Sequence, residues 1–102
     1  MSEPTVAEGR AQAVLGDWVR TPHGYRGRVY AIHHSCPESD EWLALQVIQP
    51  TASQLEGKWA SVLCDGGGSV CHPAEALEIL PHPIKGFRHP FASMYFREVM
   101  DV

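Results

Sequence analysis

The stretch GDWVRTPHGYRGRVYAI, residues 16–32, decides the fold. Its glycines suit either a phosphate-binding loop or the turn of a β-hairpin. A phosphate loop needs glycines that lead from a strand into a helix N-terminus, where free amides meet the anion. Here Gly24 and Gly27 lead into RVYAI, which is rich in β-forming residues and predicts a strand. We therefore predict a hairpin in which these glycines permit positive φ angles in the turn.

Short β-type patterns continue beyond this hairpin and alternate with loops. Leu43, Leu45 and Val47 alternate with other residues, which is typical of a strand with one buried face. AEALEIL (residues 74–80) offers one helical turn with Leu77 and Leu80 facing inward. Short antiparallel strands favour a small barrel, because closure limits exposed edges. The predicted fold is mainly β, a single five-stranded antiparallel barrel with strands over residues 17–21, 28–34, 42–49, 58–64 and 69–73.

The two ends of the chain differ from this pattern. Residues 1–15 predict a flexible N-terminal segment, with one or two helical turns ended by Gly16. The barrel covers residues 16–80, and residues 81–102 form a C-terminal arm. Prolines keep the first half of the arm extended, and FASMYFREVM (residues 91–100) predicts a short helix. Such a helix is marginal alone, so it must pack on its own barrel or on a partner chain.

Composition and charge narrow the possible partners. The formal net charge is −4, which disfavours general nucleic-acid binding, although three arginines and His23 gather near the start. The odd count of three cysteines argues against a disulfide framework. No long apolar run predicts a membrane span, and no secretory signal is visible, so we expect a cytoplasmic protein.

The order of small residues in residues 16–80 resembles SH3-like barrels, including the KOW and Tudor-like groups. The residues that carry this resemblance form the pattern G-D-x-V, a glycine turn and then G-x-V. They are Gly16, Asp17, Val19, Gly24, Gly27 and Val29. HPAEALEIL resembles the short turn and closing strand that end many such barrels. The resemblance implies an SH3-like barrel and carries little information about function.

A second resemblance is to the type II dihydrofolate reductases, small barrels found on plasmids and integron cassettes. The likeness rests on Gly16, Asp17, Val19 and Arg20, and on Pro73 followed by ALE. It implies a tetramer around one pore and an NADPH-dependent reductase from a mobile genetic element. Where that family has Val-Gln-Ile-Tyr, this chain reads SVCH (residues 69–72), without the glutamine and tyrosine that contact cofactor and substrate. Lys58 falls in a different strand from the family's pore lysine.

Cysteines and histidines form two clusters, HHSC (residues 33–36) and CDGGGSVCH (residues 64–72). Neither has the C-x-x-C spacing of a strong zinc site, and we predict no metal. A three-residue hairpin loop would place Cys64 and His72 on one face of the sheet and Cys71 on the other. Cys36 beside His33 lacks an oxyanion site, so we predict no catalytic residues.

These observations predict a non-catalytic binding or assembly module without a cofactor, which associates with a protein partner or with further copies of itself. The predicted binding residues are Trp18, Arg20, His23, Tyr25, Arg26 and Arg28. The predicted oligomer interface comprises Phe87, Phe91, Met94, Tyr95, Phe96 and Val99. Two alternatives stay open: an NADPH-dependent reductase, by the second resemblance, and nucleic-acid binding through the arginine-rich loop.

Overall fold

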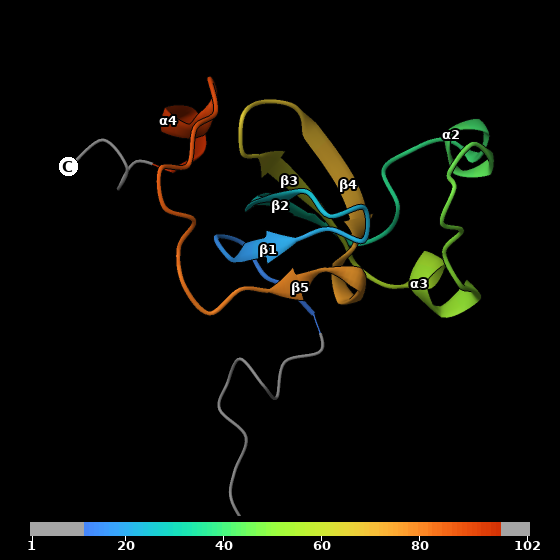
Figure 1. The fold of residues 1–102 in the computed structure, drawn as a ribbon. Helices are drawn as coiled ribbons and strands as arrows, with labels where there is room; N and C mark the ends of the chain where they lie inside the picture. Colours follow the sequence, from blue (N-terminus) through green and yellow to red (C-terminus); the bar gives the residue numbers. More distant parts are fainter. Residues whose placement is uncertain (1–11, 97–102) are drawn as a thin grey trace, which may run out of the picture.

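The computed structural model describes residues 12–96, which form one antiparallel sheet with short helices around it (Figure 1). The strand order is β4-β3-β2-β1-β5. The strands are β1 (Trp18–Arg20), β2 (Arg26–His33), β3 (Trp59–Cys64), β4 (Ser69–Pro73) and β5 (Glu78–Ile79). The helices are α2 (Asp40–Ala44), α3 (Ala52–Glu56), α4 (Ala92–Tyr95) and the 3-10 turn η1 (Ala74–Ala76). The predicted class, mainly β with five antiparallel strands, is confirmed.

The sheet is not closed into the barrel that the sequence predicts. β4 and β5 lie at its two edges, and no ladder joins them within residues 12–96. η1 turns the chain after Pro73, and β5 then pairs with β1 at the opposite edge. β5 has only two residues, so this edge offers few backbone groups for a ladder with β4. Leu77 is buried as predicted, whereas Leu80 is half-buried.

β2 and β3 form the centre of the sheet, and β3 is buried along its whole length. Gly27 pairs with Cys64, and a Cβ at position 27 would overlap the carbonyl oxygen of Leu63. Gly27 is therefore required by the close approach of β3, and the predicted positive φ is wrong for this residue. Gly24 does have a positive φ, 91°, in the β1–β2 turn, as predicted.

A bulge in β2 redirects one aromatic side chain. Val29 pairs with Val62 but Ala31 pairs with Ser61, so Tyr30 is the extra residue of the bulge. Its hydroxyl lies 2.7 Å from Oγ of Ser69 on β4. The bulge thus ties β2 to the edge strand β4 across β3.

Apolar clusters pack on both faces of the sheet. The first comprises Ala13, Val19, Val29, Ala60, Val62, Ala74 and Leu77. Ala13 also donates its N–H to the Ala74 carbonyl at 3.1 Å, so the packed unit includes a residue from the predicted N-terminal segment. Residues 12–16 contain a bend and a turn, so the predicted helical turn is wrong there, and its residues before 12 lie outside the described region.

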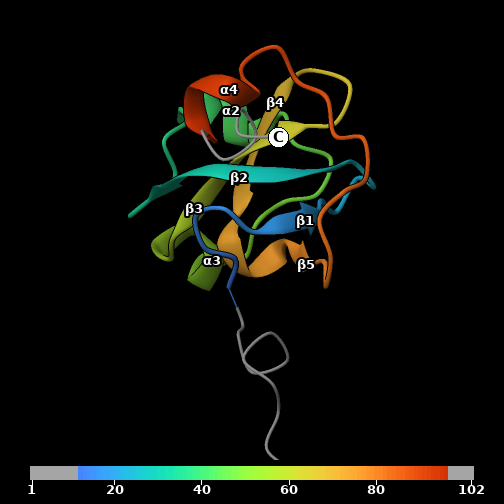
Figure 2. The same ribbon diagram turned by 90° about the vertical axis from the view of Figure 1, so that its left-hand side faces the viewer.

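The second cluster attaches the arm to the other face of the sheet. Leu63, Ala92 and Phe96 are buried together, with Tyr30 and Phe87 packed against them. Figures 1 and 2 show the arm passing from β5 along one side of the sheet to α4. The predicted helix over residues 91–100 is shorter in the described part, where α4 ends at Tyr95, and residues 97–100 lie outside it. No helix among residues 12–96 combines the length and the apolar character needed to cross a bilayer.

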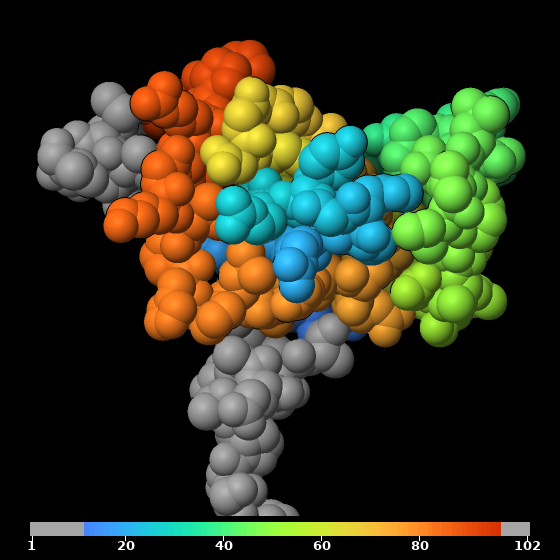
Figure 3. All heavy atoms as spheres, in the orientation of Figure 1, coloured from blue at the N-terminus to red at the C-terminus, as the bar shows by residue number. Residues whose placement is uncertain are grey.

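The β2–β3 connection (residues 34–58) projects from one end of the molecule (Figures 1 and 3). The strand predicted over residues 42–49 is wrong, because α2 and loop occupy these positions. Ser39 Oγ accepts from the Trp42 N–H at 3.1 Å, and two carboxylates follow in the first turn, which stabilises a helix N-terminus. Leu45 and Val47, predicted to share a buried face, are 80% and 88% exposed.

Candidate functional site

Two of the predicted binding residues instead hold the arm on the sheet. The guanidinium carbon of Arg28 lies 4.7 Å from the ring centroid of Trp18 and 4.2 Å from that of Phe96. Arg28 Nε also donates to the Gly16 carbonyl at 2.9 Å. The Trp18 ring meets Phe87 edge-on at 5.1 Å. Such stacking of a cation on aromatic rings stabilises the packing, and it occupies the faces that a ligand would need.

Arg20 is paired at the edge of the sheet. Its Nε and Nη2 donate to Oε1 of Glu78 at 2.9 and 2.7 Å, which links β1 to β5. Both side chains are about half exposed, at 50% and 56%, so this ion pair contributes little to stability.

The other three predicted binding residues, His23, Tyr25 and Arg26, are exposed in and beside the β1–β2 turn. The turn is held by the Thr21 N–H, which donates to the Tyr25 carbonyl at 2.7 Å. The six predicted binding residues therefore lie in three places: under the arm, at the sheet edge and on the turn.

The predicted interface residues of the arm also divide into two groups. Phe96 is buried and Phe87 is half-buried against the sheet of the same chain. Phe91, Met94 and Tyr95 are exposed, with Met94 the most exposed at 68%. Val99 lies outside the described residues. The arm thus covers its own sheet and presents a second apolar surface outward.

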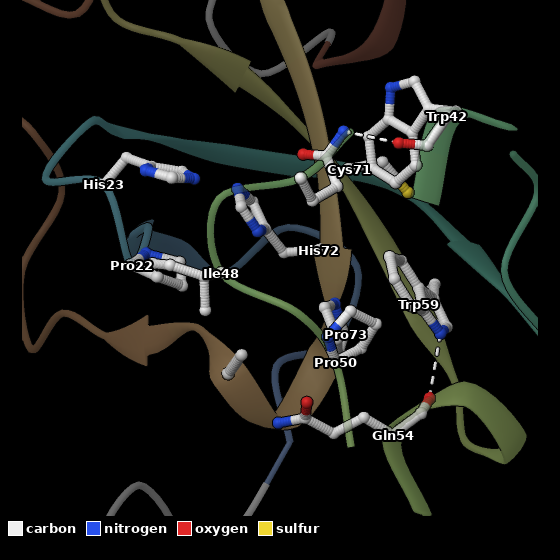
Figure 4. Close-up of a pocket in the computed structure, with 12 residues that line it drawn as sticks. Pro22, His23, Trp42, Ile48, Pro50, Gln54, Trp59, Cys71, His72 and Pro73 are labelled. Atoms are coloured by element: carbon white, nitrogen blue, oxygen red, sulfur yellow. Dashed lines mark hydrogen bonds between the residues drawn. The ribbon is translucent and has the colours of Figure 1, made fainter. Parts of the chain in front are cut away.

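Histidine, cysteine and tryptophan side chains line a groove beside β4 (Figure 4). The groove joins a cavity of about 320 Å³ to a narrower one of about 60 Å³, which share five lining residues. The five shared residues are His23, Trp42, Gln46, Cys71 and His72. In Figure 4 the two histidines lie on one side and the two tryptophans, Trp42 and Trp59, on the other. These residues come from three segments that are distant in sequence, and the sheet and the β2–β3 connection bring the segments together.

One wall of the groove is built by the β2–β3 connection. Thr51 and Gln54 form a capping box that starts α3, and the Gln54 carbonyl accepts from Nε1 of Trp59 at 2.9 Å. The Trp59 ring then meets Trp42 edge-on, with centroids 6.4 Å apart. Gln46 Nε2 donates to the Trp42 carbonyl at 2.9 Å. The Ser39 cap of α2 bonds the Trp42 backbone, and the capping box of α3 precedes the Gln54 carbonyl that holds Trp59. Both helix caps therefore help to orient the two tryptophans.

The thiol of Cys71 is held in its protonated form. Burial is the main cause that raises the pKa of Cys71 from 9.0 to about 11. A side-chain hydrogen bond with Ser61 lowers this pKa, and electrostatic interaction with Cys36 and Glu38 raises it. Ser61 Oγ also lies 2.9 Å from Nε2 of His33. Thiols act as nucleophiles and metal ligands when deprotonated, so Cys71 contributes a neutral surface at pH 7.

His72 is held in its neutral form. Burial lowers the pKa of His72 from 6.5, and His23 opposite lowers it further, since two charged imidazoles would repel each other. The two ring centroids are 5.6 Å apart. A neutral imidazole offers one donor and one acceptor to a ligand.

The hairpin register confirms the predicted placement of the cysteines. Val62 pairs with Val70 and Ala60 with His72, so Cys64 and His72 share one face, and Cys71 lies on the other opposite Ser61. All three cysteines are free. Within residues 12–96, no three His, Cys, Asp or Glu side chains gather closely enough to hold a metal ion.

Four of the shared groove residues were not predicted to contact a bound molecule: Trp42, Gln46, Cys71 and His72. Two signals were available. Ser39 followed by two acids is a helix-start pattern that disfavours a strand from residue 42, and T-x-x-Q at residues 51–54 is the pattern that starts α3. The contact between His23 and His72 leaves no local signal. A comparison with protein-family models finds no match, and no curated protein and no solved structure matches this chain.

Proposed function

We propose that this chain is a non-catalytic binding and assembly module that holds a compact ligand in the groove and joins other protein chains through the arm. The groove carries the binding half of this proposal. Its larger cavity, about 320 Å³, is of the size that small-molecule sites have. Aromatic and apolar side chains form most of the wall of the narrower cavity, whereas hydrogen-bonding side chains form most of the wall of the larger one. An apolar recess beside convergent polar groups is typical of ligand sites.

The protonation states of the groove support binding over covalent catalysis. A nucleophilic cysteine needs a lowered pKa and an adjacent base, and the pKa of Cys71 is raised. Neutral His72 is suited to hydrogen bonding with an uncharged ligand.

The wall composition indicates the class of ligand. Glu38 is the only Asp, Glu, Lys or Arg side chain among the described residues that line the two cavities. Trp42 and the proline rings, Pro22, Pro50 and Pro73, present flat apolar surfaces to the space. We infer a planar, uncharged ligand with an aromatic ring that carries a hydrogen-bond donor.

The test is protein-observed NMR with indole as the first probe. We expect saturable shifts of the backbone amides of Gln46, Cys71 and His72. Trp42→Ala removes one wall and should weaken these shifts, whereas Tyr25→Ala, an exposed aromatic residue outside both cavities, should leave them unchanged. Shifts that map elsewhere, or equal effects of the two substitutions, would contradict the proposed site.

The assembly half rests on the exposed part of the arm. Phe91, Met94 and Tyr95 form an apolar surface that is anchored by Phe87 and Phe96 beneath it. Exposed apolar clusters on an anchored segment are typical of interaction surfaces. Its test is the mass of the full chain measured by sedimentation from micromolar to millimolar concentration. A concentration-independent monomer would remove this half and leave the groove unaffected.

A further inference from the structure

Most of the exposed large apolar side chains among residues 12–96 lie at two places far apart. One is the arm surface, which comprises Phe91, Met94 and Tyr95. The other is the connection surface, which comprises Leu45, Val47 and Leu55 on the β2–β3 connection. In Figure 1 α4 lies at one end of the molecule and α2 and α3 at the other, and in Figure 2 α4 stands in front of α2 along the line of sight. The two views agree that the surfaces lie at opposite ends.

The two segments that carry these surfaces have opposite net charge. The β2–β3 connection, residues 34–58, contains four exposed carboxylates, Glu38, Asp40, Glu41 and Glu56, and one exposed cation, Lys58. Residues 81–96 contain Lys85 and Arg88, both exposed, and no carboxylate. The neighbouring Asp65 on the β3–β4 turn accepts from the Arg88 backbone N–H at 3.0 Å. An acidic apolar surface and a basic apolar surface are complementary in apolar character and in the sign of their charge.

We propose that copies of this chain associate head to tail, with the arm surface of one copy seated on the connection surface of the next. This inference rests on the assembly half of the proposed function and adds the surface that receives the arm. Because the two surfaces lie at opposite ends, one pair of copies satisfies only one contact and leaves one surface of each kind unpaired. Further copies therefore add until a ring closes or an open chain grows.

Two symmetric dimers are the alternatives to head-to-tail association, and each places like charges against each other. A two-fold dimer through arm against arm brings Lys85 and Arg88 of both copies together, which like-charge repulsion disfavours. A dimer through connection against connection brings together two segments that each hold four carboxylates and one lysine, so their net charges repel. Head-to-tail contact is the arrangement that pairs each apolar surface with the opposite charge.

The experiment uses two double variants of the full chain. Leu45→Ser with Val47→Ser removes apolar area from the connection surface, and Phe91→Ser with Met94→Ser removes it from the arm surface. All four side chains are more than half exposed, so the folded monomer should keep its thermal midpoint. The matched control is Leu15→Ser with Tyr25→Ser, which are also exposed apolar residues but belong to neither surface. Masses are measured by sedimentation equilibrium.

We expect the unmodified chain and the control to assemble beyond a dimer with rising concentration, and each double variant to associate at least tenfold more weakly. A mixture of the two double variants should recover a complex of one copy of each and nothing larger, because it retains one intact pair of surfaces. High salt should weaken assembly of the unmodified chain.

Three outcomes would overturn the inference. If the arm variant alone loses assembly, the contact is arm to arm, and the proposed function survives without the head-to-tail arrangement. If the unmodified chain stays monomeric, both the arrangement and the assembly half fail, while the groove remains to be judged by indole binding. If the mixed variants remain monomers although the unmodified chain assembles, the two surfaces do not meet each other.

Discussion

The guanidinium of Arg28 on β2 stacks on the ring of Phe96 at the end of α4, with 4.2 Å between the guanidinium carbon and the ring centroid. The same guanidinium lies over Trp18, so a residue from the opening hairpin holds the arm against the sheet. This contact joins parts of the chain that are 68 residues apart, from residue 28 to residue 96.

Removing the Phe96 ring should destabilise the fold. Phe96 is 4% exposed, and its replacement by alanine leaves a cavity beside Leu63 and exposes one face of Arg28. We expect Phe96→Ala to lower the free energy of unfolding by about 3 kcal/mol or more. Phe91→Ala in the same arm should change it by less than about 1 kcal/mol, because Phe91 is exposed. Urea unfolding of both variants at a concentration where the chain is monomeric measures the difference, and equal losses would show that the arm is not packed as described.

Two glycines of the opening stretch should respond differently to alanine. In Gly27→Ala the new Cβ meets the backbone of β3, which cannot move without breaking the ladder, so we expect a loss of about 3 kcal/mol or more. In Gly24→Ala the Cβ meets nothing within 4 Å, and only the positive φ is strained, for about 1 kcal/mol. Thermal and urea unfolding rank the two, and a larger loss at Gly24 would contradict the close approach of β2 and β3.

Acid should destabilise the fold through His72. The pKa of His72 is lowered in the folded state, so between that value and 6.5 the unfolded chain binds more protons than the folded one. The stabilisation that neutral His72 contributes to the free energy of unfolding is complete above pH 6.5 and is lost as the pH falls through the folded-state pKa. The comparison is urea unfolding of the unmodified chain and of His72→Gln from pH 8 to pH 5. We expect the free-energy difference between them to change with pH in this window, and a constant difference would show that His72 titrates normally.

The cysteines should alkylate in an order set by burial and pKa. At pH 8 a thiol with a pKa of about 11 is a thiolate in roughly one molecule in a thousand, so Cys71 should be nearly inert. Burial also raises the pKa of Cys64, while Cys36 is half-buried. We expect iodoacetamide to label Cys36 first, with peptide mass spectrometry as the readout. In denaturant the three thiols should react alike, which controls for the peptides themselves.

NADPH should leave the thermal midpoint unchanged. This cofactor carries several phosphate charges, and no lysine or arginine is among the described residues that line the groove. Differential scanning fluorimetry with millimolar NADPH tests this, with indole as the comparison ligand. A clear rise with NADPH would favour the reductase alternative, because any ligand that binds only the folded state stabilises it.

Local patterns were sufficient for the strands that pair with their neighbours in sequence. The β-forming residues of β2 with the glycine turn before it, and the glycines after Asp65, predicted the β1–β2 and β3–β4 hairpins, and the three-residue loop placed Cys64 and His72 on one face. The same reasoning failed at residues 42–49. Alternation there coincides with exposed positions, and the helix cap at Ser39 outweighs it.

The sequence by itself determined the mainly β class, the hairpins and the chemical identity of each side chain, because strand alternation and glycine turns act over a few residues. Only the tertiary structure decided which side chains meet. It turned Arg28 into a contact for the arm, placed His23 opposite His72 beside Trp42, and put the exposed parts of the arm and of the β2–β3 connection at opposite ends. These relationships depend on burial between segments distant in sequence, and no local pattern records them.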